Sequence, residues 1–133
     1  MLIINSEEIS PLVFELLSFA TSKSKVRNEY SLYLEKPDRT LYGYESNGVI
    51  IGCIGIEVIQ SHKCEIKHIA VNVEHRRIGI GRKMIQYIND KYKTIIAETD
   101  KDAIDFYKSY GFTVISLGQT YPGVERFNCM ITR

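Results

Sequence analysis

Residues 76–82 read RRIGIGR, in which two glycines are separated by one residue and flanked by arginines. The segment follows an apolar run and precedes apolar residues with helical spacing, so we expect it at a helix N-terminus. Such an end exposes unpaired N–H groups and a partial positive charge, and glycines let an anion approach the main chain. The segment therefore suits a pyrophosphate or a similar anion. The simpler alternative is a strand-to-helix turn with solvated charges.

Two nucleotide-binding patterns are excluded in this segment. A dinucleotide-binding fold requires G-x-G-x-x-G, and Met84 occupies the position of the third glycine. A P-loop ends in G-K-[ST], whereas this segment continues as GRKM. Magnesium-nucleotide chemistry therefore loses its main support, and a bound phosphate would belong to another kind of ligand.

The elements that position this segment follow from apolar periodicity and from turn residues. Ser10-Pro11 indicates a helix start, Pro37 ends a second helix, and Asn47-Gly48 is a strong hairpin signal. Gly111 suits the position just after a helix end. The expected strands span residues 1–4, 40–46, 48–59, 64–71, 94–98, 112–117 and 125–132, and the expected helices span residues 11–20, 26–36, 80–92 and 100–110.

This order of elements predicts a mixed α/β fold, with antiparallel strands first and a strand–helix–strand unit afterwards. The continuous apolar character of residues 48–59 indicates a strand that is buried on both faces. With 44% hydrophobic and 25% charged residues, the 133-residue chain has a globular composition, and we expect one domain over residues 1–133.

Charge and cysteine content narrow the class of protein. The net charge of +1 and the lack of a base-reading motif argue against nucleic-acid binding. No apolar run approaches membrane-spanning length, and the N-terminus lacks the pattern of a signal peptide, so no membrane association is expected. Cys53, Cys64 and Cys129 have no metal-site spacing. We therefore expect reduced thiols, no bound metal and a cytoplasmic location.

Two motifs carry a resemblance to a known family. The run Arg76-Arg77-Ile78-Gly79-Ile80-Gly81 matches [RQ]-x-x-G-x-[GA], and residues 100–112, DKDAIDFYKSYGF, resemble N-x-x-A-x-x-F-Y-x-x-x-G-F. In the second motif, Asp100 stands where asparagine is common. Both motifs, in this order and at this separation, are similar to those of the GNAT superfamily, the acyl-CoA-dependent N-acetyltransferases.

The resemblance implies a central mixed sheet with flanking helices, in which two parallel strands, residues 64–71 and 94–98, splay apart. The pantetheine arm of acetyl-CoA would lie in the split beside main-chain groups of Ile69 and Val71, and its pyrophosphate would bind the amides of residues 77–82. The residues implied to contact this co-substrate are Ile69, Ala70, Val71, Arg76, Arg77, Ile78, Gly79, Ile80, Gly81, Arg82, Asp100 and Phe106.

The resemblance also implies a general acid. Tyr107 would protonate the thiolate of coenzyme A as it leaves. The alternative is that Tyr107 is a core aromatic residue, like Phe106 beside it. Because consecutive helical residues point to different faces, only one of the two need belong to the core.

Glu65 is the implied general base, since in a regular strand it would share a face with Ile69 and point into the cleft. Two alternatives remain open: an ion pair with Lys63 or Lys67, and a chain of water molecules in place of a side-chain base. His68 has the opposite parity, and we interpret it as a half-buried histidine without a catalytic role.

The implied activity is transfer of the acetyl group of acetyl-CoA to a primary amine of a small molecule or peptide, by direct attack in a ternary complex. The alternative is a GNAT-fold acyl-CoA-binding or regulatory module with weak or no catalysis, for which Asp100 is the only mild argument. No side-chain pattern in the sequence identifies the acceptor amine. Both a monomer and a homodimer are compatible with the sequence.

Overall fold

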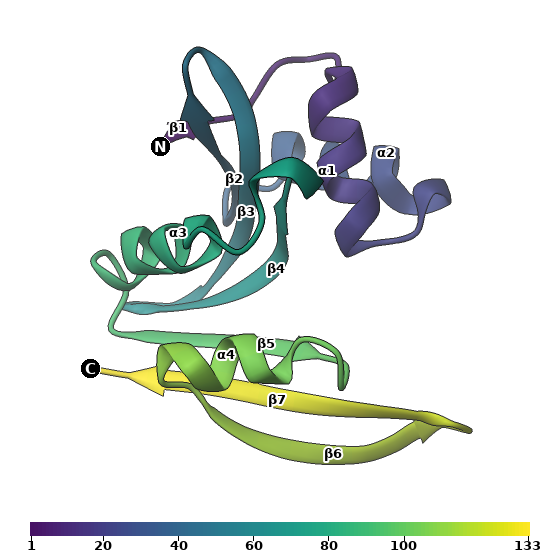
Figure 1. Ribbon diagram of the computed structural model, residues 1–133, viewed down its shortest axis with the longest axis vertical. Helices are drawn as coiled ribbons and strands as arrows, with labels where there is room; N and C mark the ends of the chain where they lie inside the picture. Colours follow the sequence, from purple (N-terminus) through teal and green to yellow (C-terminus); the bar gives the residue numbers. More distant parts are fainter.

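A computed structural model describes all 133 residues and contains a seven-stranded sheet with helices on both faces (Figure 1). The strands are β1 Leu2–Ile3, β2 Arg39–Ser46, β3 Val49–Gln60, β4 Lys63–Val71, β5 Thr94–Thr99, β6 Thr113–Tyr121 and β7 Val124–Thr132. The helices are α1 Pro11–Ala20, α2 Lys23–Glu35, α3 Ile80–Asn89, α4 Ile104–Tyr110 and the short 3-10 helix η1 Val73–His75. The predicted order of elements and the mixed α/β class are confirmed.

The strand order in the sheet is β1-β2-β3-β4-β5-β7-β6, and only the pair β4–β5 is parallel. All other neighbours are antiparallel. In Figure 1, β1 to β4 with α1, α2 and α3 form the upper part of the molecule, and β5 to β7 with α4 form the lower part. The single parallel pair therefore joins two units that are each built from antiparallel strands.

Two elements differ most in extent from their predictions, while α2 begins three residues earlier and α3 ends three residues earlier than predicted. The helix predicted from residue 100 begins only at Ile104, because Asp100 Oδ1 accepts a hydrogen bond from the Asp102 amide at 3.0 Å and holds a turn there. The last hairpin is longer than predicted, since β6 continues to Tyr121. Register shifts beside Gly118, whose φ is 77°, let the two strands keep pairing through the region predicted to be a loop.

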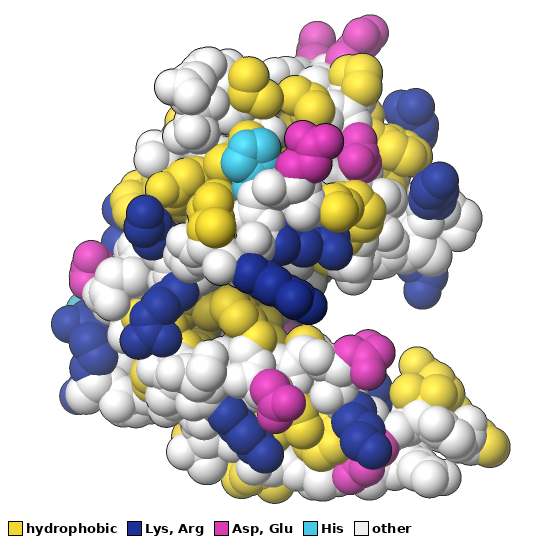
Figure 2. Space-filling view, viewed as in Figure 1, with side chains coloured by type: hydrophobic (Ala, Val, Ile, Leu, Met, Phe, Trp, Pro, Cys, Tyr) yellow, Lys and Arg dark blue, Asp and Glu magenta, His cyan; other side chains and the backbone are white.

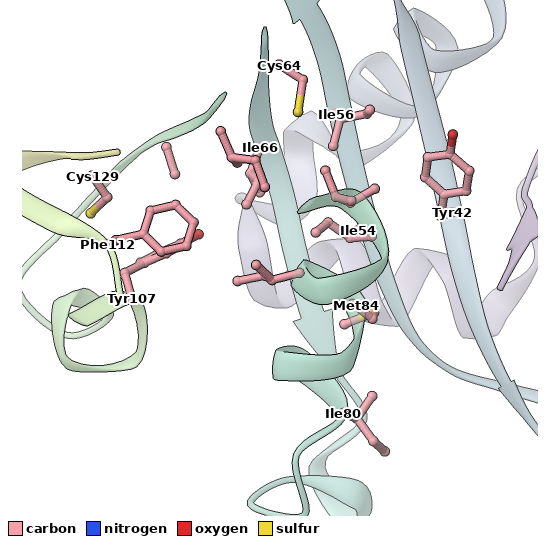
Figure 3. Packing of buried hydrophobic residues seen from close by; sticks show 14 of the residues in the cluster. Tyr42, Ile54, Ile56, Cys64, Ile66, Ile80, Met84, Tyr107, Phe112 and Cys129 are labelled. Carbon is pink, nitrogen blue, oxygen red and sulfur yellow. The ribbon is translucent and has the colours of Figure 1, made fainter. Parts of the chain in front are cut away.

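Two apolar clusters occupy the two faces of the sheet. The cluster on the face of α3 and α4, drawn in Figure 3, includes Ile54, Ile56, Cys64, Ile66, Met84, Ile88, Tyr107 and Phe112. The cluster on the face of α1 and α2 includes Val13, Leu17, Val26, Tyr33, Leu41, Cys53 and Ala70. β3 contributes to both clusters, and its residues 51–56 are all buried. The prediction that this strand is buried on both faces is confirmed for residues 51–56, whereas Val49 and Ile59 near its ends are exposed.

The sheet opens between its two parallel strands. β4 pairs with β5 only as far as Ile66, after which β4 continues beside β3 and β5 continues beside β7. At the same place Lys67 is an extra residue, because Ile66 and His68 pair with successive residues of β3 and Lys67 pairs with none. A bulge of this kind bends its strand and increases the local twist. The predicted splay is confirmed, and the bulge explains where it starts.

Candidate active site

Two adjoining cavities occupy the split between β4 and β5, and Figure 2 shows the hollow that crosses the molecule there. The loop cavity, of about 550 Å³, borders residues 76–82. The strand cavity, of about 710 Å³, borders the end of β5 and the start of α4. The two cavities form one continuous cleft, because they share the lining residues Phe19, Ile69, Arg76, Ala103 and Phe106.

The loop cavity ends at the start of α3, where free main-chain amides are available. The first hydrogen bond of the helix runs from Lys83 N to Gly79 O at 3.0 Å, so the amides of Ile80, Gly81 and Arg82 precede it. Gly79 caps the helix with φ 88°, a left-handed conformation that favours glycine. Residues 79–82 all line this cavity. The geometry is that of an anion site at a helix N-terminus.

The second glycine is required for a different reason. A Cβ at Gly81 would lie 3.0 Å from the ring of Phe106, which reaches across from α4. Phe106 is 36% exposed and lines both cavities. Gly81 therefore lets α4 and the start of α3 approach each other across the cleft.

Two of the arginines connect residues 76–82 to neighbouring walls of the cleft. Arg76 donates from Nε to Val71 O at 3.0 Å, and its guanidinium lies 4.8 Å from the centre of the Phe19 ring. Arg82 donates to Ser109 O at 3.3 Å and lies over the ring of Tyr110. These contacts link residues 76–82 to α1 and to α4 respectively. Only Arg77, which is exposed, stands outside this set of contacts.

The open edge of β4 presents main-chain groups to the cleft. Asn72 N donates to Ile51 O of β3 at 2.7 Å, and successive residues of a strand direct their main-chain groups alternately to either side. Val71 and Ile69 therefore direct theirs toward the split, as the Arg76 contact with Val71 O also indicates. Such an edge is suited to an extended ligand that adds to the sheet as a strand does.

Tyr107 lines the strand cavity from α4 and is only 4% exposed. Its ring packs edge-to-face against Phe106 and Phe112, with centroid distances of 5.3 and 5.1 Å. Figure 3 shows the ring extending from α4 toward the strands. Burial raises the pKa of Tyr107 above its usual value, so the phenol remains a neutral O–H donor near neutral pH. The Tyr107 hydroxyl forms no hydrogen bond within the chain, and it is not among the fully buried atoms that lack a partner, so it is open to the cavity.

Glu65 lies outside the cleft, and the prediction that it shares a face with Ile69 is wrong. The extra residue at Lys67 reverses the alternation of faces, so Glu65 lies on the face of α2, opposite Glu57 of β3. Its carboxylate forms an ion pair with Lys67 at 2.9 Å, and Glu65 lines neither cavity. Glu65 also precedes the split, in the part of β4 that still pairs with β5.

The same bulge places His68 at the cleft, where the sequence indicated no functional position. His68 lines the strand cavity but is only 6% exposed, so it is buried rather than half-buried. Its Nδ1 lies 2.6 Å from Tyr33 Oη, and its Nε2 lies 3.5 Å from Glu29 Oε1. Burial lowers the pKa of His68, and the nearby Glu29 carboxylate partly offsets that effect. Residue spacing gave no signal for this arrangement, because a bulge cannot be recognised from alternation alone.

The other predicted contact residues divide between the two cavities. Ile69, Ala70, Val71, Arg76, Arg77, Gly79, Ile80, Gly81, Arg82 and Phe106 line the loop cavity. Ile78 is 64% exposed and lines neither cavity. Asp100 lines the strand cavity, together with Tyr107, and is separated from the anion site. The structure therefore brings the glycine motif together with β4 and Phe106, but places Asp100 elsewhere.

The split sheet beside a glycine-containing helix start defines a class of proteins that hold an extended, phosphate-bearing ligand along a strand edge. The protein-family model of the GNAT acetyltransferase domain matches residues 37–114 of this chain. A Bacillus methanolicus protein, described as an uncharacterized N-acetyltransferase in the lysA 3' region, is 34% identical over 95 residues, which cover 69% of this chain and 79% of that protein. The chain belongs to the GNAT acetyltransferase family.

Solved structures share the same fold. A GNAT family acetyltransferase from Elizabethkingia anophelis, with acetyl-CoA bound, has a TM-score of 0.75 and 20% identity, covering 98% of this chain and 95% of that one. An aminoglycoside 6'-N-acetyltransferase complexed with coenzyme A has a TM-score of 0.79 and 15% identity, covering 99% and 97%. At such low identity the likeness establishes the fold.

None of the helices combines the length and the apolar character needed to cross a membrane. No group of three or more His, Cys, Asp or Glu side chains is arranged to hold a metal ion.

Proposed function

We propose that this chain transfers the acetyl group of acetyl-CoA to a primary amine of a small molecule or peptide, by direct attack in a ternary complex. The observation that carries the proposal is the continuous cleft, with helix-start amides at one end and the unbonded Tyr107 hydroxyl toward the other. Family membership supports acyl transfer in general. The relatives solved with acetyl-CoA and with coenzyme A support the choice of co-substrate.

Acetyl-CoA would be held mainly by main chain. The pyrophosphate would accept hydrogen bonds from the amides of Ile80, Gly81 and Arg82, with Arg76 and Arg77 adding positive potential. The pantetheine arm would run along the open edge of β4 beside main-chain groups of Ile69 and Val71. This placement directs the thioester toward the strand cavity, where Tyr107 lies.

The reaction then requires one bond to form and one to break. A neutral amine attacks the thioester carbonyl, the N–C bond forms, and the C–S bond breaks with its electron pair on sulfur. The thiolate takes the Tyr107 proton, which solvent later replaces, and the proton lost by the nitrogen passes to water on the polar side of the cleft. Tyr107 suits this role because burial keeps its phenol protonated, so the O–H can donate a hydrogen bond to the sulfur as negative charge develops there, with proton transfer following along that bond.

The test is release of the coenzyme A thiol with a panel of amines, polyamines, aminoglycosides, amino acids and peptide N-termini. Tyr107→Phe should lower kcat by roughly ten- to a thousandfold while acetyl-CoA binding stays nearly intact, because the hydroxyl acts only on the leaving group. Tyr42→Phe is a matched control, since Tyr42 is a buried tyrosine of the same apolar cluster that lines neither cavity. An unchanged rate in Tyr107→Phe would remove Tyr107 as the acid.

The second candidate function is an acyl-CoA-binding module without turnover. It shares the cleft and the anion site, so thermal stabilisation by acetyl-CoA would support both candidates. The unbonded hydroxyl of Tyr107 favours the enzyme, because a purely binding site has no need of a free donor on the wall of the strand cavity. Binding of acetyl-CoA with no thiol release across the whole amine panel would favour the module.

A further inference from the structure

His68 and Tyr107 reach the split between β4 and β5 from opposite faces of the sheet. Tyr107 belongs to the apolar cluster on the face of α3 and α4. His68 contacts Tyr33, which belongs to the cluster on the face of α1 and α2. Both His68 and Tyr107 line the strand cavity. A thioester that enters the split therefore has a proton donor on one face and an imidazole on the other.

The two ring nitrogens of His68 have different surroundings. Nδ1 lies 2.6 Å from Tyr33 Oη. Nε2 forms no hydrogen bond within the chain, and it is not among the fully buried atoms that lack a partner, so it is open to the strand cavity. Glu29 Oε1 lies 3.5 Å from Nε2, within ion-pair distance. The protein therefore holds one nitrogen and leaves the other at the cleft, beside a carboxylate.

Both partners of the imidazole are fixed by the fold. Gly55 of β3 pairs with His68, and a Cβ at this glycine would collide with Tyr33 Oη, so the contact with Tyr33 requires a glycine there. Glu29 is held by Arg39, which donates to its carboxylate at 3.3 Å. Replacing buried polar contacts by apolar packing is often neutral for stability, so the arrangement is better explained by the orientation it gives the ring.

We propose that His68 Nε2 accepts the proton that the acceptor amine loses, through a water molecule of the strand cavity. The proposal rests on the acetyl transfer proposed above. Tyr33 is a positioning residue, because Nδ1–H donates to its oxygen and the lone pair then remains on Nε2. Glu29 is a second positioning residue, which stabilises the imidazolium.

The step is balanced in bonds and protons. The amine nitrogen forms its bond to the acetyl carbon as the C–S bond breaks with its electron pair on sulfur. The nitrogen loses one proton, which reaches His68, and the sulfur gains one proton, which comes from Tyr107. Solvent then removes the proton from His68 and restores the one on Tyr107, so the products are an amide and a thiol.

The charges around His68 favour a neutral imidazole at neutral pH. Burial, opposed by Glu29 and assisted by Arg39 and Lys67, lowers the pKa of His68. The other titratable groups that contact the ring or line the strand cavity are Tyr33, Tyr107, Arg76, Arg126, Glu98, Asp100 and Asp102. The two tyrosines stay neutral because burial raises the pKa of each. With Lys67, the cavity has three basic and three acidic side chains, whose charges balance.

The kinetic test is the pH dependence of kcat/KM for the most active amine of the panel. Above the pKa of His68, log kcat/KM should rise with pH with a slope of about 1, because only the amine must lose a proton. Below that pKa the slope should approach about 2, because His68 must also be deprotonated. His68→Gln should lower kcat/KM at neutral pH roughly a hundredfold and keep a slope of about 1 throughout.

His62→Asn is the matched control and should keep both slopes, since His62 lies in the turn between β3 and β4 and lines neither the loop cavity nor the strand cavity. A slope that still approaches about 2 in His68→Gln would overturn the proposal, because another group would then be the base.

Glu29→Gln is a second variant that leaves the imidazole in place. Glu29 raises the pKa of His68, so loss of its charge should move the change of slope to lower pH. It should also lower kcat/KM at neutral pH roughly two- to tenfold, because the imidazolium loses its counter-ion. Glu35→Gln, which removes an exposed carboxylate of the same helix, is the matched control. A change of slope that stays at the same pH in Glu29→Gln would contradict the proposal.

A measurement without turnover separates this inference from the proposed function. Nitrogen-15 NMR of the protein saturated with coenzyme A reports which ring nitrogen of each of the three histidines carries a proton. His62→Asn and His75→Asn identify the signals of the other two histidines. We expect the proton of His68 on Nδ1 at neutral pH. A proton on Nε2 would overturn the role of His68 even if amines are acetylated, whereas the expected tautomer without thiol release across the amine panel would contradict the proposed acetyl transfer.

Discussion

The segment from Arg76 to Arg82 and the turn from Asp100 to Ala103 border the same cleft, yet they present different groups to it. The first offers main-chain amides at the start of α3, and the second offers side-chain carboxylates. Main-chain sites depend on backbone shape and on glycine, so they leave a pattern that is readable in sequence. Side-chain sites depend on which residues the fold brings together. The comparison explains why the glycine segment was recognisable in the sequence as an anion site, whereas the turn before α4 carried no such pattern.

The largest expected effect concerns Gly81, where the main-chain site is most crowded. Gly81→Val should weaken coenzyme A binding at least about tenfold, because its side chain would both cover the helix-start amides and collide with Phe106. Titration calorimetry with coenzyme A measures this loss, and thermal unfolding monitors the fold. An affinity within about twofold of the original would show that the amides are not the anion site.

Gly79→Ala is the matched control for this change. A Cβ at Gly79 meets nothing within 4 Å, but the φ of 88° disfavours any other residue. We therefore expect a loss of about 1–2 kcal/mol in the free energy of unfolding, with a smaller loss of coenzyme A affinity than in Gly81→Val. A larger loss of coenzyme A affinity in Gly79→Ala than in Gly81→Val would contradict this distinction, in which Gly81 is needed for space and Gly79 for its backbone conformation.

The second prediction concerns the side chains that line the strand cavity. His68→Gln should lower the free energy of unfolding by about 1–3 kcal/mol, because Tyr33 and Glu29 lose a buried partner. His62→Asn is the matched control, since His62 lies in the turn between β3 and β4 with a φ of 65° that asparagine tolerates. Denaturant unfolding of both variants checks the difference, and equal losses would contradict the role of the buried contacts.

The pH dependence of that stability has a definite sign. Burial, opposed by Glu29 and assisted by Arg39 and Lys67, lowers the pKa of folded His68 below its ordinary value of 6.5. Below about that pH the unfolded chain binds a proton that the folded chain resists, so stability falls as the pH drops through this region. This pH-dependent contribution to the free energy of unfolding should disappear in His68→Gln and remain in His62→Asn. Thermal unfolding from neutral to mildly acidic pH measures it, and an unchanged slope in His68→Gln would rule it out.

The sequence was informative wherever a local pattern determined the structure. The two motifs and the apolar periodicity predicted the element order, the mixed sheet and the residues around the anion site. The predicted placement of Glu65 on the face of Ile69 was wrong because it assumed regular alternation along β4, and one extra residue at Lys67 exchanges the faces. The contacts of His68 could not be predicted for the same reason. They also depend on α2, which is distant in sequence and meets β4 only in the folded chain.

The smallest expected effect concerns Arg77, which tests whether the anion site depends on main chain rather than on its arginines. Arg77→Gln should weaken coenzyme A binding only about two- to threefold, since an exposed guanidinium adds little in water. The difference should shrink as ionic strength rises, because salt screens exposed charges. Arg76→Gln should cost more, because Arg76 also bonds Val71 O and stacks on Phe19. A loss of about tenfold or more in Arg77→Gln that persists in high salt would assign the pyrophosphate to a side chain and reverse the comparison between the two ends of the cleft.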